Sequence, residues 1–170
     1  MSSLIHFSNF LPLFMEHKKP YSRFFLMLGT SLVAMYVVMY LNVYEWDHVY
    51  FSMTRLYMSL LMLVPMTLIM MGFMWSMYPN KQRNALIMGG SLALFVVVTI
   101  MVRSQTFIGD TLWMRAMIPH HSIAIMVSKR ADIKDPEVRK LADDIIEAQE
   151  REIKQMQQML ARLKQERAAQ

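Results

Sequence analysis

Apolar residues are concentrated in three long runs, and polar residues are interspersed among apolar ones only after the third. The runs cover residues 24–44, 56–78 and 85–102 and contain no charged residue. Each approaches the roughly 20 residues that an α-helix needs to cross about 30 Å of hydrocarbon. The pattern therefore predicts three membrane-spanning helices, followed by a charged domain outside the bilayer.

The region after the third run predicts two further helices, over residues 107–131 and 136–167. Between them, Asp135 is a favourable N-cap and Pro136 suits the first helical position. Glu137 then places negative charge at the positive end of the helix dipole. With three spans and a helical hairpin, the predicted fold class is all-α.

Apolar positions of the second hairpin helix repeat in alternating steps of four and three, which is typical of a helix packed along its length. Leu141, Ile145 and Met159 widen this stripe. Two helices alone do not bury both of their stripes. We therefore expect hairpins from two or more chains to pair, most simply into a ferritin-like four-helix bundle. The seam consists of Ala142, Ile146, Gln149, Ile153, Met156, Leu160 and Leu163.

Charge divides the chain into an N-terminal segment (1–22), a membrane region (23–103) and a helical-hairpin domain (104–170). The formal net charge is +5, but residues 103–170 hold 12 Lys and Arg against 10 Asp and Glu. Much of the surplus lies beside the apolar runs, where it sets membrane topology. Nucleic acid is therefore not an expected partner, whereas the lipid bilayer is.

Orientation follows from the basic residues of the short connections. The N-terminal flank carries Lys18, Lys19 and Arg23, and the loop before the third run carries Lys81 and Arg83. Such residues remain in the cytoplasm, so the N-terminus is expected there and the hairpin on the far side. In a bacterium this predicts an inner-membrane protein with a periplasmic C-terminal domain.

Cysteine is absent, which excludes disulfides, thiolate metal sites and a catalytic thiol. Methionine, in contrast, accounts for 20 of the 170 residues. Its thioether is apolar and flexible, and its sulfur suits the soft ions Cu(I) and Ag(I). The methionines therefore allow two interpretations, packing and metal binding.

The first hairpin helix has an unusual inner face, with a carboxylate, two thioethers and an imidazole where Leu and Ile are expected. Pro119 favours a kink, which would either turn both adjacent imidazoles toward one place or serve packing. Gln149 and Glu152 of the second helix need polar partners, such as a metal ion or its ligands. The face is formed by Phe107, Asp110, Met114, Met117, His121 and Ala124, with His120 at its edge.

Two hairpin segments, Trp113–Met126 and Asp135–Ile153, resemble the domain of unknown function 305 family. That family is ferritin-like and helical, and some members, the CopM-like proteins, are periplasmic copper binders. The resemblance covers about residues 105–160 and implies a domain that binds copper or silver. This chain differs from the soluble copper-binding members in having a single His-His hairpin and a membrane anchor. The implied metal ligands are Asp110, Met114, Met117, His120, His121, Met126, Gln149, Glu152 and Met156.

Methionines also recur at every fourth residue of the second span, which places them in a slow spiral along one side of a helix. The row is interpreted either as packing or as a path for soft metal ions. His48, in the loop between the first two spans, is expected to be a solvated residue, with a role as an additional ligand as the alternative. The row consists of Met58, Met62, Met66, Met70 and Met74, with Met77 after it.

These patterns lead to two hypotheses of different classes. The first is a membrane-anchored periplasmic protein that binds Cu(I) or Ag(I) through a Met/His cluster. It would sequester the ion in metal tolerance or pass it to other periplasmic metal-handling proteins. The second is a structural module whose hairpins assemble a homo-oligomer without a metal. A di-metal oxidase needs several Glu and Glu-x-x-His ligands in a bundle and is ranked last, so no enzymatic activity is expected.

Overall fold

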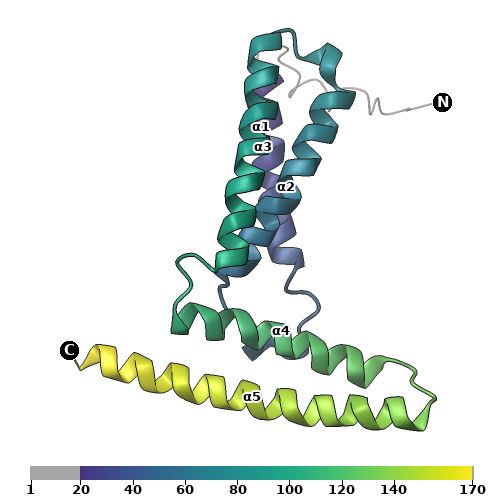
Figure 1. Ribbon diagram of the computed structural model, residues 1–170, viewed down its shortest axis with the longest axis vertical. Coiled ribbons are helices and arrows are strands. Elements are labelled where there is room, and N and C mark those ends of the chain that lie inside the picture. Colours follow the sequence, from purple (N-terminus) through teal and green to yellow (C-terminus); the bar gives the residue numbers. More distant parts are fainter. Residues whose placement is uncertain (1–19, 170) are drawn as a thin grey trace, which may run out of the picture.

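The computed structural model describes residues 20–169, and this part of the chain is all-α, as predicted (Figure 1). Most of the predicted N-terminal segment, residues 1–19, lies outside the described residues. The helices are α1 (Pro20–Val38), α2 (Met53–Phe73), α3 (Lys81–Ser104), α4 (Asp110–Arg130) and α5 (Pro136–Ala168), with 3-10 turns η3 (Trp46–His48) and η4 (Trp75–Met77).

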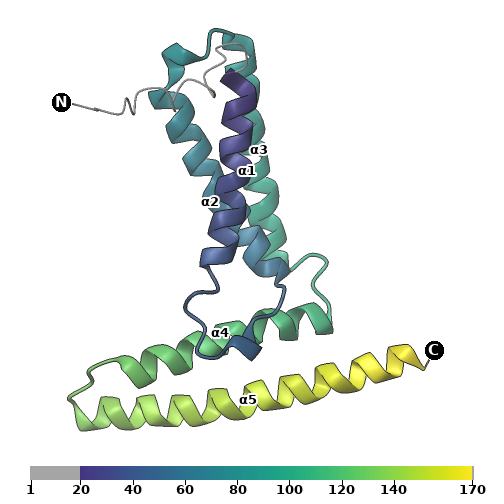
Figure 2. The same ribbon diagram turned by 180° about the vertical axis from the view of Figure 1, so that it is seen from behind.

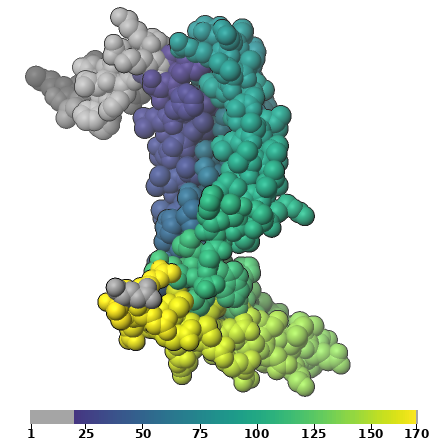
Figure 3. Space-filling model, turned by 60° about the vertical axis from the view of Figure 1, so that its left-hand side comes forward, coloured from purple at the N-terminus to yellow at the C-terminus, as the bar shows by residue number. Residues whose placement is uncertain are grey.

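The helices form two units that meet at one end of a bundle. Helices α1, α2 and α3 stand side by side, and α4 and α5 run across the end of this bundle (Figures 1 and 2). Helix α4 lies between the bundle and α5, as the green and yellow surfaces of Figure 3 show. All three bundle helices are long and apolar enough to cross a membrane, in agreement with the three predicted spans.

The ends of the spans differ from the predicted ones because hydropathy does not register helix caps. The first helix stops at Val38 instead of residue 44, since the apolar run continues into a turn. The second begins earlier than predicted, where the Ser52 hydroxyl accepts a hydrogen bond from the Arg55 amide at 3.2 Å. The third also begins earlier, where the Asn80 side chain accepts from the Arg83 amide at 2.9 Å. Both are ordinary N-cap contacts.

The bundle is held together most tightly at the end away from the hairpin. Phe24 and Leu28 of α1 form a buried cluster with Met71 of α2 and Tyr78. Asn84 of α3 is fully buried and donates to the Tyr78 carbonyl at 3.0 Å. Many other large apolar side chains of these helices are exposed in the single chain, which suits surfaces that face lipid.

Helices α4 and α5 form the predicted hairpin, and α5 begins where its cap predicts. The Asp135 carboxylate accepts from the amides of Glu137 at 2.9 Å and Val138 at 3.0 Å. The seam predicted for α5 faces α4, with Ala142, Ile153 and Met156 buried. The spacing of apolar residues therefore identified the packed face of this helix correctly.

Helix α4 begins at Asp110 and not at Phe107, because the chain turns sharply after α3. Gln105 and Phe107 both have positive φ angles, of 51° and 62°. Left-handed backbone at these two positions is incompatible with a continuous helix. Phe107 therefore does not share the helical face of Asp110 and Met114, contrary to the spacing argument.

The loop between α1 and α2 is tied to the middle of α4. The hydroxyl of Ser122, a fully buried residue, accepts a hydrogen bond from the Tyr44 amide at 2.7 Å and lies 2.9 Å from His48 Nδ1. The prediction that His48 is solvated was wrong, because this contact buries it to 7% exposure. Lys129 also reaches the loop, with its ammonium 4.5 Å above the Tyr44 ring.

Candidate functional site

The predicted metal ligands of α4 divide between two faces of the helix. The ring centroids of His120 and His121 are 6.3 Å apart and the ring planes are inclined by 69°. Successive residues of an α-helix project about 100° apart, and Pro119 does not change this outcome. His121 faces α5, whereas His120 faces the bundle. This arrangement favours a packing role of the buried Pro119 over the alternative in which both imidazoles face one place.

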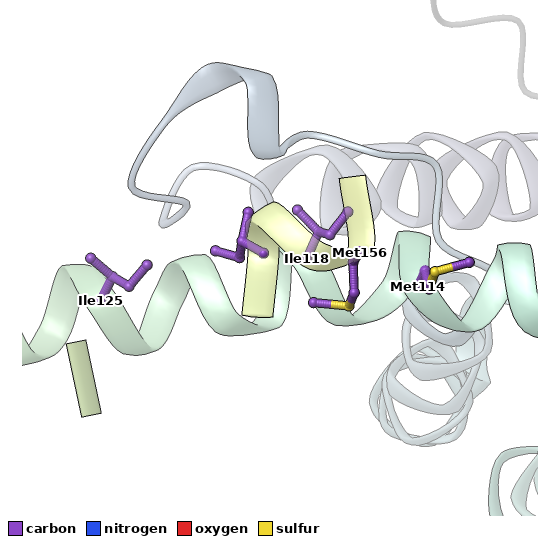
Figure 4. Packing of buried hydrophobic residues seen from close by; sticks show 5 residues of the cluster. Met114, Ile118, Ile125 and Met156 are labelled. Atoms are coloured by element: carbon purple, nitrogen blue, oxygen red, sulfur yellow. The ribbon is translucent and has the colours of Figure 1, made fainter. Parts of the chain in front are cut away.

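The face toward α5 brings two predicted sulfur donors into one buried cluster. Met114 of α4 and Met156 of α5 are 5% and 6% exposed and pack with Ile118, Ile125 and Ile153. Figure 4 shows Met156 next to Ile118, with Met114 and Ile125 on either side of them along α4. The surroundings are apolar, so both thioethers contribute to the core of the hairpin.

His121 and Glu152 form a hydrogen-bonded pair beside this cluster. The Nε2 atom of His121 lies 2.7 Å from the Glu152 carboxylate, and its Nδ1 lies 2.9 Å from the Met117 carbonyl oxygen. A carbonyl oxygen only accepts, so Nδ1 donates to it. The 2.7 Å separation of Nε2 and the carboxylate is that of a hydrogen bond. Glu152 thus has the polar partner that its position beside the seam requires.

Three further predicted ligands, Asp110, Met126 and Gln149, are more peripheral. Asp110 is exposed in the first turn of α4 and lines a shallow pocket with Met114, Met159 and Arg162. Met126 and Gln149 are half-buried. Met114 and Met156 therefore lie in the buried core of the hairpin, His121 and Glu152 pair across the α4–α5 interface, and these three residues belong to neither group.

The opposite face of α4 borders a cavity of about 490 Å³ at the end of the bundle, which we call the junction cavity. Met117 and His120 of α4 line it together with Met39 and Met58 of the membrane region. In the sequence, Met58 is predicted only as a member of the methionine row of the second span, and Met39 is not among the predicted metal ligands. No local pattern indicates that α4 folds back onto them, because the contact joins residues far apart in the chain.

Arg55 supplies a positive charge at the wall of the junction cavity. Its guanidinium donates to the Met39 carbonyl oxygen and lies 4.2 Å from the centroid of the Tyr40 ring. These contacts hold the side chain in place at the start of α2. Any ligand of the cavity is therefore bound next to a fixed cation.

The loop from Glu45 to His48 contains a Glu-x-x-His sequence that the sequence analysis overlooked. Glu45, Asp47 and His48 bring their ligand atoms within 4.8 Å of one another, and both carboxylates lie 3.8 Å from His48 Nε2. This motif lies on a 3-10 turn and not on a bundle helix. The carboxylates are exposed, and the other ring nitrogen of His48 is engaged by Ser122.

Electrostatic contacts on the exposed side of the hairpin are ordinary ion pairs. Lys129 Nζ lies 2.7 Å from Glu150 and 3.4 Å from the Tyr44 hydroxyl. The hydrogen bond to Glu150 is the main reason that the pKa of Lys129 lies above its ordinary value. Lys129 therefore remains positively charged wherever the hairpin is folded near neutral pH.

Comparison with known proteins gives a match over the hairpin. A protein of Acanthamoeba polyphaga mimivirus, described as uncharacterized, is 39% identical over 72 residues, which are 41% of this chain and 47% of that protein. The chain thus spans about half the length of this relative. No solved structure matches. The family model described as "Domain of unknown function (DUF305)" matches residues 101–167, so the helical hairpin of this chain belongs to that family.

Proposed function

We propose that this protein is a membrane-anchored metal-binding protein whose hairpin holds Cu(I) or Ag(I). The observation that supports this most directly is that Met114 and Met156 belong to one buried cluster of α4 and α5, while His121 and Glu152 pair across the same two helices. Two thioethers and an imidazole form a donor set that soft monovalent ions prefer. The ion would be sequestered there or passed on in metal tolerance.

The four residues fit such an ion in both chemistry and charge. The thioethers of Met114 and Met156 are neutral and remain deprotonated at any pH, and His121 offers Nε2. Binding through Nε2 would replace the hydrogen bond of this atom to Glu152. The freed carboxylate would then offset the charge of the ion at the edge of the cluster. Both helices contribute donors, so binding would also stabilise the hairpin.

The distribution of charge supports a periplasmic position of the hairpin. Arg23, Lys81 and Arg83 lie at the end of the bundle away from α4 and α5 (Figure 1). Basic residues favour the cytoplasmic side, so the hairpin would face the periplasm of a bacterium. Copper and silver handling in that compartment suits a chain that contains no cysteine.

Replacement of sulfur by carbon at similar volume tests the proposal. The double variant Met114→Leu, Met156→Leu keeps the apolar cluster but removes both thioethers. In the purified full-length protein, we expect its Ag(I) affinity at the hairpin to fall at least tenfold, as measured by competition titration. Met159→Leu, at a 48% exposed position of α5, is the matched control and should bind normally. Unchanged affinity and stoichiometry in the double variant would exclude the hairpin as the binding site.

A structural role is the second candidate, and an exposed apolar face on α5 favours it. Val138, Leu141, Ile145 and Met159 are 37–60% exposed in the single chain. A pure assembly module predicts the same oligomer in the presence of a chelator and no response to copper. The two functions are compatible, since a second chain on this face would cover α5 without displacing the metal donors.

A further inference from the structure

The junction cavity gathers soft donors from parts of the chain that are distant in sequence. It is lined by three thioethers, of Met39, Met58 and Met117, and by the imidazole of His120. One comes from the end of the first span, one from α2 and two from α4. These four side chains are the soft metal donors of its wall, which also includes the polar residues Asn42, Ser52, Thr54, Arg55 and Gln105.

The sulfur of Met39 is held in position by a neighbouring hydroxyl. Ser59 is fully buried, and its Oγ lies 3.4 Å from Met39 Sδ and 2.9 Å from the Arg55 carbonyl oxygen. A thioether sulfur has two lone pairs, and a contact with one hydroxyl leaves the other free to bind an ion. Met58 and His120 are both exposed toward the cavity side of the junction, so an ion has access to them.

We propose that the junction cavity is a second soft-metal site, separate from the hairpin site, in which Met39, Met58, Met117 and His120 bind one Cu(I) or Ag(I) ion. The choice of metal rests on the proposed function, and the location rests on the cavity. Three thioethers and one imidazole are neutral ligands of the type that Cu(I) and Ag(I) accept. Unlike the hairpin site, this one requires the membrane helices.

Arg55 makes the junction cavity selective for a monovalent ion. The repulsion between its guanidinium and a bound ion is proportional to the charge of the ion. None of the four ligands carries a negative charge to compensate for a divalent ion. Zn(II) and Cu(II) are therefore excluded more strongly than Cu(I) or Ag(I).

The position of the cavity connects the hairpin site to the membrane region. Met117 lines the cavity and also packs against the cluster that contains Met114 and Met156. On the other side, Met58 begins the methionine row of α2. The junction site thus lies between the hairpin donors and the end of that row nearest to α4. An ion that moves between weak thioether sites would cross this place.

Metal stoichiometry of the full-length protein in detergent tests this site. We expect two Ag(I) ions per chain in the wild type and one in the variant Met39→Leu, Met58→Leu. Met62→Leu is the matched control, because Met62 lies on the same helix and does not line the cavity. Two ions in the cavity variant, or a single wild-type ion that disappears in Met114→Leu, Met156→Leu, would overturn the proposal.

The experiment can contradict the proposal for one site without contradicting the proposal for the other. If Met114→Leu, Met156→Leu keeps full binding while the cavity variant loses it, the hairpin assignment is wrong and the junction site stands. In the hairpin variant loaded with Cu(I), X-ray absorption should show three sulfur ligands and one nitrogen ligand. His120→Ala, at an exposed position, should remove the nitrogen without affecting folding. An unchanged spectrum, or displacement of Ag(I) by a tenfold excess of Zn(II), would contradict the ligand set.

Discussion

His120 and His121 are adjacent residues of α4 with the same side chain, but their surroundings differ. His121 is fixed between the Met117 carbonyl and Glu152, whereas His120 faces the junction cavity. The regular spacing of Met and His residues along this helix predicted a Met/His cluster. It did not indicate which histidine meets which partner, since that depends on how α4 is rotated about its axis between α5 and the bundle.

Backbone strain at Phe107 gives a prediction at the level of one residue. Its φ of 62° is unfavourable for a side chain with a Cβ, and its ring is 79% exposed and packs little. Phe107→Gly should therefore stabilise the protein by about 1 kcal/mol, which corresponds to a rise in Tm of about 2–4 °C. Thermal unfolding in detergent measures this. Ile108→Gly is the control, and it should lower the Tm, since Ile108 is half-buried and its φ is not positive. A lower Tm in Phe107→Gly would show that the ring has a role in packing.

At the level of elements, local chemistry determined some boundaries better than others. The start of α5 was predicted to the residue because Asp135 and Pro136 form a cap that is readable in sequence. The end of α1 was misplaced by six residues because the apolar run continues through the turn that follows Val38. Hydropathy reports where a segment is apolar, and a helix end is decided by hydrogen bonds.

The contact between the first loop and α4 was not predictable, because it joins residues that are 78 positions apart. It depends on Ser122, which accepts from the Tyr44 amide and contacts His48. Each local segment is compatible with many arrangements of the hairpin on the bundle. The junction cavity exists only because this contact and the α2–α4 packing select one of them.

Ser122→Ala tests how this contact joins the two units. The substitution leaves the Tyr44 amide and the His48 ring without their partner in a buried place, at a cost of about 1–3 kcal/mol. We expect the loop to separate from α4 while both helical units stay folded. Hydrogen exchange should then be faster at Tyr44 and unchanged in the α4–α5 core. Ser128→Ala, in the last turns of α4, is the control, and equal protection of Tyr44 in both variants would refute the role of Ser122.

At the level of the whole molecule, the hairpin leaves an apolar surface on α5 that one chain does not cover. The seam toward α4 is buried, whereas Val138, Leu141, Ile145 and Met159 remain exposed beside it. The sequence predicted the width of this stripe correctly. It also predicted that a second hairpin covers the outer part, and the structure of a single chain leaves that as a prediction.

Charge on the exposed stripe of α5 should separate the chains. The double variant Leu141→Glu, Ile145→Glu places two carboxylates where apolar side chains would meet those of a second hairpin, and burying them unpaired is costly. We expect an oligomer for the wild type and a monomer for the variant, as measured by light scattering in mild detergent. Lys140→Glu, at an exposed position on the opposite side of α5, should remain oligomeric. Because the α4–α5 interface is intact in all three proteins, Ag(I) binding at the hairpin should persist in the monomer. A monomeric wild type would contradict the prediction that a second hairpin covers the stripe.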